Sequence, residues 1–475
     1  MSIQKEKCPH AKKCGGCQLQ NLNYTEQLSL KQRISIRNLG KFGHVEEIIG
    51  MENPYNYRNK VQAAFATKRD GKIVSGVYQS STHNIVSVDK CQTEDIKADK
   101  IIVSIRKLLK DFKLTTYNEF TTRGFLRHVL VKRGFATGEI MVVLVTGTPV
   151  FTAKKHFVNE LLKLHPDITT IIQNVNNKHT SMLLGENEKV LYGKGYIYDI
   201  SCGCKFRISA KSFYQINPIQ TEVLYGTAMK FAGLTGKEQV LDAYCGIGTI
   251  GLVASKNAGN VLGVEINKDA VKDAISNAKE NNAKNIRFIC ADAGNVMVEM
   301  AEINEPCDVV FMDPPRAGSD EKFLSSLCKL SPKKVVYISC NPETQARDLE
   351  YLTKKGYKVT KIQPVDMFPH TNHIETVVLL SQQRPNDKIG VELKLDEIDL
   401  TSAEQKATYQ EIKDYVLKEF DLKVSTIYIS QIKKKCGLEV GKSYNTSKKD
   451  NQTIPQCPKD KENAIKAALK YFKMI

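Results

Sequence analysis

The sequence contains no tryptophan and no apolar run long enough to cross a membrane. A membrane-spanning helix needs about 20 consecutive apolar residues, and the opening stretch MSIQKEKCPHAKKC is charged where a secretory signal peptide would be apolar. We therefore expect a cytoplasmic protein without a membrane anchor. In that reducing compartment the 13 cysteines are not expected to pair as disulfides. Clustered cysteines then indicate metal ligands or nucleophiles, and isolated ones indicate small core residues.

The sequence has fewer acidic than basic residues: 52 Asp and Glu and 69 Lys and Arg, which give a net charge of +17. This excess favours a polyanionic partner, since it raises the local concentration of phosphate groups. A lysine-rich solvated surface would give the same balance, so charge alone does not decide. With 475 residues, 41% of them hydrophobic, the chain can form two to four folded units of about 150 residues each. Nothing in the sequence indicates an obligate protein partner.

The first two regions of the chain differ in pattern. Residues 1–50 hold a cysteine cluster followed by a helix that ends at Gly40. Residues 51–210 contain short β-rich runs with turn signals at Asp70-Gly71 and Thr137-Gly138. This pattern predicts a central antiparallel sheet that carries one or two helices.

Strands alternate with helices in the third region, residues 211–385, from about residue 236 onward. Such alternation predicts a doubly wound α/β domain with a largely parallel sheet. The fourth region, residues 390–475, is rich in lysine, and its periodicity predicts helices. We expect it to form a small basic appendage.

A glycine-rich turn in VLDAYCGIGTIGL joins a strand to a helix and indicates a ligand site. Gly246 and Gly248 would let a ligand approach the backbone. Glu265 ends the next strand, where a carboxylate could bind a ribose diol and would repel a 2′-phosphate. The spacing does not match the dinucleotide fingerprint, so an adenosine cofactor fits better; an ordinary strand-to-helix turn is the alternative.

Two further strand ends carry candidate chemistry. Asp313 ends a strand in DVVFMDPPRAG, where two prolines stiffen the turn. Similar turns occur in enzymes that methylate exocyclic amino groups, so this motif alone is ambiguous. Cys340 follows the strand in KKVVYISCNPETQARDL, at the same edge of the predicted sheet, and is a candidate nucleophile.

A thiol and a base are what methylation of uracil at C5 would require. Uracil C5 is too weak a nucleophile to take a methyl group from a sulfonium, but thiolate addition to C6 gives C5 carbanion character. The C5 proton must then leave, which requires a base. Glu375 opens an apolar strand in MFPHTNHIETVVLL, where desolvation would raise its proton affinity. His370 and His373 are rival bases.

The motifs LDAYCGIGTIGL, FMDPPRAG, ISCNPETQARDL and HTNHIETVVLL, in this order, resemble the RNA 5-methyluridine (uracil-C5) methyltransferase family. The resemblance covers about residues 8 to 381 and is strongest to the iron–sulfur-containing bacterial 23S rRNA branch. It implies an S-adenosylmethionine-dependent enzyme in which Cys340 is the nucleophile and Glu375 the proton acceptor. The positions that match the family's cofactor contacts are Gln215, Tyr244, Glu265 and Asp313, and those near the substrate base are Phe213, Gln215 and Asp313.

The fold that this resemblance implies is a class I (Rossmann-like) methyltransferase domain with a preceding or inserted β-rich α+β domain. An N-terminal iron–sulfur segment and a small helical C-terminal appendage complete it. The implied substrate is a specific uridine of structured RNA, with 23S rRNA preferred to tRNA. The rival from another class is a non-catalytic RNA-binding protein, against which the presence of Cys340, Glu375 and Asp313 counts.

The cysteine cluster in CPHAKKCGGCQ supplies three ligands, and a fourth comes from VDKC; the four are Cys8, Cys14, Cys17 and Cys91. By spacing, four thiolates suit an iron–sulfur cluster and tetrahedral zinc equally well. The family resemblance favours a [4Fe-4S] cluster, with zinc as the alternative. Cys202 and Cys204 form a C-x-C pair on predicted strands, which we interpret as packing residues.

The stretch TTRGFLRHVLVKRG reads as a basic strand. Its basic side chains would line an extended face against RNA phosphates. They are Arg123, Arg127, His128, Lys132 and Arg133. A solvated edge strand is the alternative. The family resemblance favours RNA.

The C-terminal region ATYQEIKDYVLKEFDLKVSTIYISQIKKKCGLEVGKSYN predicts a helix, a turn, a β-like run and a further helix, somewhat like a helix-turn-helix unit. Its lysines suggest an RNA-docking appendage. A solvated helical extension that packs on the catalytic domain is equally consistent with the pattern.

Overall fold

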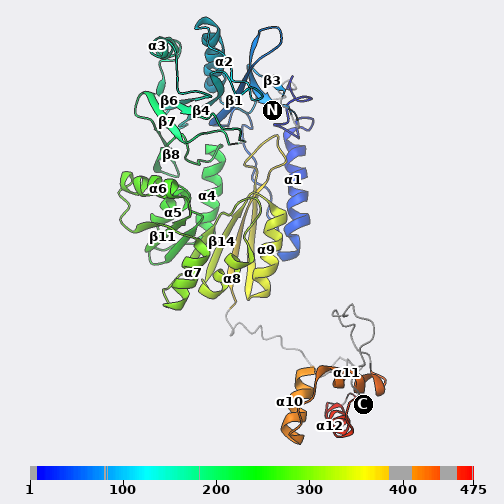
Figure 1. The fold of residues 1–475 in the computed structure, drawn as a ribbon. Coiled ribbons are helices and arrows are strands. Elements are labelled where there is room, and N and C mark those ends of the chain that lie inside the picture. Colours follow the sequence, from blue (N-terminus) through cyan, green and yellow to red (C-terminus); the bar gives the residue numbers. More distant parts are fainter. Residues whose placement is uncertain are drawn as a thin grey trace. The chain divides into compact units, whose positions relative to one another are not determined.

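The computed structural model describes residues 8–79, 82, 84–180, 182–383, 409–438, 457–472 and 474. The chain divides into two compact units, Met1–Asp387 and Lys388–Ile475 (Figure 1). The first unit contains all of the predicted catalytic residues, and each unit is described by itself below.

Helix α1 (Tyr24–Leu39) is the predicted N-terminal helix. It begins at Asn23, whose side chain and that of Glu26 form a reciprocal capping box. Gly40 follows its end and starts a short 3-10 turn, Gly40–Phe42. The buried stripe of α1 is mostly polar, with Gln27, Lys31 and Ser35 at four-residue spacing. These buried polar groups therefore need partners elsewhere in the unit.

The central domain is built on one seven-stranded sheet in the order β3-β2-β1-β4-β5-β6-β7. Its strands are β1 (Lys60–Thr67), β2 (Ile73–Tyr78), β3 (Ile85–Ser87), β4 (Leu126–Arg133), β5 (Ile140–Thr146), β6 (Ile168–Val175) and β7 (Asn187–Tyr192). Helices α2 (Ile96–Asp111) and α3 (Lys154–Leu164) pack on one face. The predicted hairpin turns at Asp70-Gly71 and Thr137-Gly138 are confirmed, since β1–β2 and β4–β5 pair antiparallel.

The central sheet is mixed, where the sequence predicted an antiparallel one. Strands β5 and β6 pair parallel, because α3 lies between them in the chain and a helical crossover returns the chain to the same end of the sheet. A separate hairpin, β8 (Ile197–Ser201) and β9 (Cys204–Ile208), follows the sheet. Cys204 is buried in the core that this hairpin shares with the next domain, which agrees with its predicted packing role.

The second sheet is the predicted α/β sheet, in the order β12-β11-β10-β13-β14-β16-β15. Its strands are β10 (Gln239–Ala243), β11 (Asn260–Glu265), β12 (Ile286–Cys290), β13 (Val309–Met312), β14 (Lys334–Ser339), β15 (Tyr357–Val365) and β16 (Glu375–Gln382). Strands β10 to β14 are mutually parallel, whereas β16 runs antiparallel to both of its neighbours.

Helices flank this sheet on both faces (Figure 1). They are α4 (Pro218–Ala232), α5 (Thr249–Ser255), α6 (Lys268–Glu280), α7 (Ala293–Glu302), α8 (Glu321–Leu330) and α9 (Pro342–Lys354). Alternate residues of one strand enter different cores: Leu241 packs with α7 and α8 residues, while Val240 packs with those of α4 and α5. A sheet covered on both faces explains the nearly continuous apolar character of its strands.

The second unit contains helices α10 (Tyr409–Phe420), α11 (Thr426–Lys435) and α12 (Lys459–Tyr471) around a core of their own. The β-like run predicted within KVSTIYIS is wrong, because this stretch is α11. Ser425 caps the helix, and Ile429 and Ile432 enter the core from one helical face. Within the described ranges, no helix is both long and apolar enough to span a bilayer.

Candidate active site

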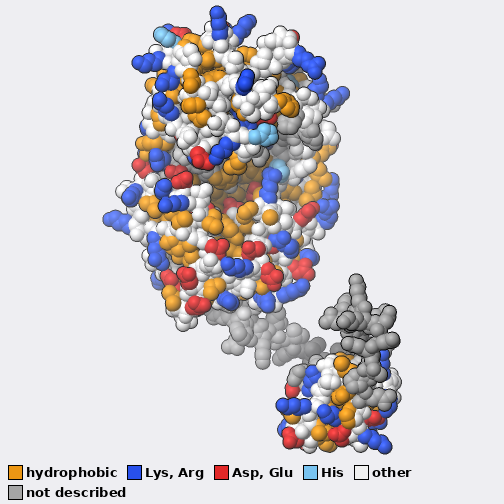
Figure 2. Space-filling view, viewed as in Figure 1, with side chains coloured by type: hydrophobic (Ala, Val, Ile, Leu, Met, Phe, Trp, Pro, Cys, Tyr) orange, Lys and Arg blue, Asp and Glu red, His pale blue; other side chains and the backbone are white. Residues whose placement is uncertain are grey.

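The predicted catalytic groups meet at one edge of the second sheet. Asp313 follows β13 and Cys340 follows β14, and parallel strands end at the same edge. Glu375 is the first residue of β16, which runs the other way, and the pairing of Ser339 with Thr376 brings its start to the end of β14. The surface of the first unit is hollowed between its two sheets (Figure 2).

Cys340 lies in a tight turn between β14 and α9. The Ser339 hydroxyl accepts a hydrogen bond from the Asn341 amide at 3.1 Å, and the Asn341 side chain caps α9. Burial raises the pKa of the half-buried Cys340 thiol to about 11, and the nearby carboxyl of Glu375 adds to this shift. The charge of Arg316 acts in the opposite direction. The thiol is therefore largely neutral in the free protein.

Glu375 is almost completely buried, with 6% of its surface exposed. Burial raises its pKa well above the ordinary value, and Asp313 raises it further, while Arg316 opposes the change. Burial also raises the pKa of Asp313 to about 7. A carboxyl with raised proton affinity beside a thiol is typical of a site that moves protons near neutral pH.

The glycine-rich turn has the backbone that a ligand loop requires. Tyr244, Gly246 and Gly248 all have positive φ, at 63°, 55° and 81°. No heavy atom lies within 4 Å of where a Cβ of Gly246 would stand, whereas a Cβ on Gly248 would come 2.6 Å from Phe288. Gly246 thus borders open space, and Gly248 is required by internal packing.

Two carboxylates hold this loop. Glu265 accepts hydrogen bonds from the amides of Gly246 at 3.1 Å and Asn267 at 2.8 Å. Asp242, at the end of β10, accepts one from the Gly251 amide at 2.7 Å. Its second oxygen, Oδ1, is buried and has no hydrogen-bond partner in the described part of the chain, and burial raises the pKa of this carboxyl to about 8. No role for Asp242 was predicted from the sequence, although this residue lies in the motif LDAYCGIGTIGL.

Phe213 and Gln215 lie in the segment that joins β9 to α4. The Gln215 carbonyl accepts a hydrogen bond from the Asn59 side chain at 3.0 Å, just before β1 begins. Phe213 is exposed over 65% of its surface. The segment is therefore anchored to the central domain while an aromatic ring remains accessible on it.

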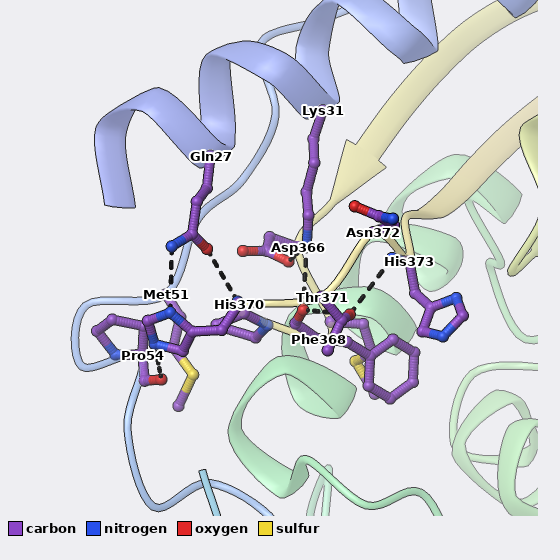
Figure 3. A network of polar contacts seen from close by, with 12 residues as sticks. Gln27, Lys31, Met51, Pro54, Asp366, Phe368, His370, Thr371, Asn372 and His373 are labelled. Carbon is purple, nitrogen blue, oxygen red and sulfur yellow. Dashed lines mark hydrogen bonds and ion pairs between the residues drawn. The ribbon is translucent and has the colours of Figure 1, made fainter. Parts of the chain in front are cut away.

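The two rival histidines differ in their surroundings (Figure 3). His370 is buried, its Nδ1 lies 3.1 Å from Gln27 Nε2 and its Nε2 lies 3.1 Å from the Pro54 carbonyl. Both ring nitrogens are thus engaged, which argues against His370 as the base. His373 is half-buried, and its Nε2 lies 3.3 Å from an Arg316 guanidinium nitrogen. Burial and the nearby cations lower the pKa of His373.

The predicted exposed basic strand is wrong for most of its members. Arg127 is only 7% exposed, and its guanidinium donates to the carbonyls of Lys178 and Thr180 and pairs with Glu119. Lys132 is likewise buried, as is His128, and Arg133 pairs with Asp95; Arg123 is exposed. Arg127 and Lys132 are buried because the loops after β6 and β9 fold over the strand and accept their hydrogen bonds. An RNA contact by Arg123 remains a prediction.

The four predicted metal-ligating cysteines line one small pocket, which they share with His10 and Thr93. The members are Cys8, Cys14, Cys17 and Cys91. Burial is the main cause that raises the pKa of the Cys17 thiol. However, no group of three or more His, Cys, Asp or Glu side chains in the described residues is arranged so that it could hold a metal ion. The pocket brings the donors together without forming a ligand set.

A sheet in the order β12-β11-β10-β13-β14-β16-β15, parallel except for β16 and with a glycine-rich loop and an acidic residue at its carboxyl edge, is typical of S-adenosylmethionine-dependent methyltransferases. Residues 187–383 match the family model of tRNA (Uracil-5-)-methyltransferases. An uncharacterised RNA methyltransferase of Clostridium acetobutylicum is 46% identical over 383 residues, which are 79% of this chain and 83% of the relative. A similarly named protein of Halalkalibacterium halodurans is 44% identical over 378 residues, or 78% and 82%.

A solved structure agrees with these matches. The Pyrococcus abyssi tRNA (uracil-54, C5)-methyltransferase, solved with S-adenosyl-L-homocysteine, is 30% identical with a TM-score of 0.66, covering 77% of this chain and 86% of that one. The chain belongs to the RNA uracil-5 methyltransferase family. Its α/β domain is therefore that of an S-adenosylmethionine-dependent RNA methyltransferase.

Proposed function

We propose that the protein methylates C5 of one uridine in a structured RNA, with 23S rRNA as the preferred substrate. The observation that carries the proposal is the meeting of the Cys340 thiol and the buried Glu375 carboxyl at one edge of the second sheet. An enzyme that methylates an exocyclic amine needs no such thiol, because the amine itself is the nucleophile.

Cys340 would act on the base rather than on the cofactor. The Cys340 thiolate bonds to uracil C6 as the C5–C6 double bond opens, and the electron pair moves to C5 and the O4 carbonyl as an enolate. C5 would then bond to the electrophilic methyl group that bound S-adenosylmethionine supplies, and the bond between that methyl group and the sulfonium would break to leave a neutral thioether. The Glu375 carboxylate then takes the proton from C5, the double bond re-forms, and the C6–S bond breaks to release the Cys340 thiolate.

The residues present fit the cofactor. Gly246 borders open space at the loop. Glu265 lies at the end of β11, where a carboxylate can accept hydrogen bonds from the hydroxyls of a ribose. The unpartnered Oδ1 of Asp242 is a buried acceptor that no described residue satisfies. The residues that would hold the cofactor are Gln215, Tyr244, Gly246, Gly248, Glu265 and Asp313, and those that would face the base are Phe213, Gln215 and Asp313.

The N-terminal cysteines are proposed to hold a [4Fe-4S] cluster, with zinc as the alternative. Thiolates are suitable ligands for either metal and the four thiols line one pocket, although they are not arranged there as a ligand set. Because these side chains are not arranged as a ligand set, their positions do not favour one metal over the other. No step of the proposed reaction depends on the cluster.

Transfer RNA is the second candidate substrate. The Pyrococcus abyssi relative acts on uracil 54 of tRNA, and the matching family model also carries tRNA in its description. The preference for 23S rRNA comes from the motif resemblance to the bacterial ribosomal branch.

Mapping 5-methyluridine in RNA from cells with and without the gene tests the proposal. We expect one site in 23S rRNA to lose its 5-methyluridine and to regain it when the wild-type gene, but not the Cys340→Ala gene, is restored. Loss confined to tRNA would overturn the 23S preference, and an unchanged map in both RNAs would overturn uracil-C5 methylation by this protein.

A further inference from the structure

A basic groove runs between the β1–β2 hairpin and helix α2, on the central domain. Its apolar lining includes Ile73 and Val103, and its polar lining consists of Asp70, Lys72, Arg106, Lys107 and Lys110. Its volume is about 540 Å³, open to solvent. The groove is separate from the carboxyl edge of the α/β sheet, where the catalytic groups meet.

The charges in the groove are mostly uncompensated. Lys72, Lys107 and Lys110 are exposed, and within the described residues none of their ammonium groups forms an ion pair. Arg106 is held at the groove wall by Asp89 at 2.7 Å and by the Ser75 hydroxyl at 3.3 Å.

The acidic member of the lining is turned toward the backbone. Asp70 accepts a hydrogen bond from the Lys72 amide at 3.0 Å within the hairpin turn. Lys68 and Arg69, at the hairpin tip, are exposed as well. Several cations therefore stand close together without enough carboxylates to neutralise them, which is the pattern that a phosphate backbone complements.

Strand β1 runs from the segment that carries Phe213 and Gln215 to the groove. Its N-terminal end adjoins the substrate segment, because the Asn59 side chain and amide bond to the carbonyls of Gln215 and Ile216. Its other end, Thr67, leads into the hairpin that forms the groove wall. Seven residue steps at about 3.3 Å each span about 23 Å.

We propose that this groove binds the phosphate backbone of the substrate RNA at a point about 23 Å from the modified uridine. The inference rests on the proposed function for the identity of the RNA. The groove engages only an RNA whose backbone extends about 23 Å beyond the target base. The groove thus selects for RNA of sufficient extent, while the catalytic edge reads the uridine.

A charge-reversal variant of the full chain tests this proposal. The groove variant is Lys72→Glu, Lys107→Glu and Lys110→Glu. The matched control changes the charge equally with Lys155→Glu, Lys279→Glu and Lys329→Glu, which are exposed lysines outside the groove. The probes are a structured uridine-loop hairpin of about 40 nucleotides and a loop fragment of about three nucleotides, which is too short to span about 23 Å. Binding is measured against salt, and methylation in parallel.

For the hairpin, we expect the groove variant to bind at least about tenfold more weakly than the control variant and to lose about two to three units of salt slope. For the short fragment, the two variants should bind alike. Equal hairpin affinity and equal slope for the two variants would overturn the groove, and so would an equal loss on the short fragment.

The binding readout does not require turnover, so the two hypotheses fail separately. If the wild-type protein makes no 5-methyluridine yet the hairpin-specific loss occurs, the proposed reaction is wrong and the groove stands. A groove variant with normal thermal unfolding excludes misfolding as the cause, and a Lys72→Ala, Lys107→Ala and Lys110→Ala variant, expected to show a smaller loss, provides the second test.

Discussion

The Cys340 thiol is poorly prepared for nucleophilic attack in the free protein. A pKa of about 11 leaves only about one thiolate in ten thousand at pH 7. The nearby charge of Arg316 stabilises the thiolate, and a backbone hydrogen bond adds to this effect. Reactivity should therefore depend on what the substrate base changes around the sulfur.

Cys340→Ala should abolish methylation while S-adenosylmethionine binding is retained, because the thiol acts on the base. Calorimetry of cofactor binding and methyl incorporation into RNA measure the two effects. In the wild-type protein, alkylation of Cys340 by iodoacetamide should accelerate as the pH rises from 7 toward 11. Measurable turnover by the alanine variant would show that Cys340 is not the nucleophile.

Glu375→Gln should allow methyl transfer but stop proton removal, so a covalent protein–RNA adduct should accumulate on a denaturing gel. Near-normal turnover without an adduct would assign the base to His373 or to solvent. His370→Asn is a useful comparison, because both ring nitrogens of His370 are already engaged.

Glu375→Gln should also change the free energy of unfolding, in a direction that follows from the raised pKa of Glu375. The pKa of Glu375 is raised in the folded protein, so the folded state binds more protons than the unfolded state, and stability falls as pH rises above the unfolded value of about 4.5. At pH 7.5, Glu375→Gln should therefore unfold at a higher temperature than the wild-type protein, and the difference should vanish near about pH 4. Thermal unfolding at both pH values measures this.

Helix α1 acts as a support for the segment that leads into β16 (Figure 3). Lys31 and Asp366 form a fully buried ion pair at 2.6 Å, and Lys31 also donates to the Phe368 carbonyl at 3.1 Å. Gln27 contacts both the backbone amide and the ring of His370. These contacts hold the chain immediately before Glu375, although α1 is remote from it in sequence.

Lys31→Ala should destabilise the protein by about 3–5 kcal/mol, because it leaves Asp366 buried and uncompensated. Denaturant unfolding measures the loss, and kcat should fall because the segment before Glu375 loses its support. The control is Lys41→Ala, whose ion pair with Glu350 is about half exposed on both sides and should contribute about 0–1 kcal/mol. Equal effects of the two substitutions would contradict the buried support.

The cysteine segment is the second element with a testable role. Anaerobically purified protein should be brown, with broad absorption near about 400 nm from thiolate-to-iron charge transfer. Cys14→Ala or Cys91→Ala should remove the colour, and Cys290→Ala, an exposed cysteine outside the pocket, should retain it. Colourless wild-type protein with stoichiometric zinc would decide for zinc.

At the scale of the whole molecule, positive charge is distributed over both units. The C-terminal unit has its own core, and α11 carries no acidic residue but ends in three lysines. Lys433 is buried against Tyr409, whereas Lys434 is exposed on the helix surface. The presence of a separate core favours an appended module, and its RNA-docking role stays a prediction.

Truncation after Gln383 should weaken RNA binding and flatten its salt dependence by about one slope unit per lost phosphate contact. Cofactor affinity and turnover on saturating RNA should be unchanged, because the catalytic residues all precede this point. Filter binding at several salt concentrations measures the effect. Unchanged RNA affinity and slope would contradict the docking role.

Local patterns in the sequence predicted most of the elements and the candidate groups of the site. The end of α1 at Gly40, the hairpin turns and the strand–glycine–helix pattern depend on neighbouring residues, so they could be predicted without knowledge of the fold. The motif order likewise indicated that Cys340 and Asp313 would share a sheet edge, since parallel strands end together.

Which side chains are buried, and which groups they form hydrogen bonds with, was decided only by the tertiary structure. Arg127 and Lys132 look like RNA contacts in sequence, yet distant loops cover them and accept their hydrogen bonds. The run KVSTIYIS has a β-like composition, but a helix buries Ile429 and Ile432 against α12. Glu375 gains its raised pKa and its place beside Cys340 because β16 enters the sheet in reverse. Such effects arise from segments far apart in the chain, whose packing no local pattern specifies.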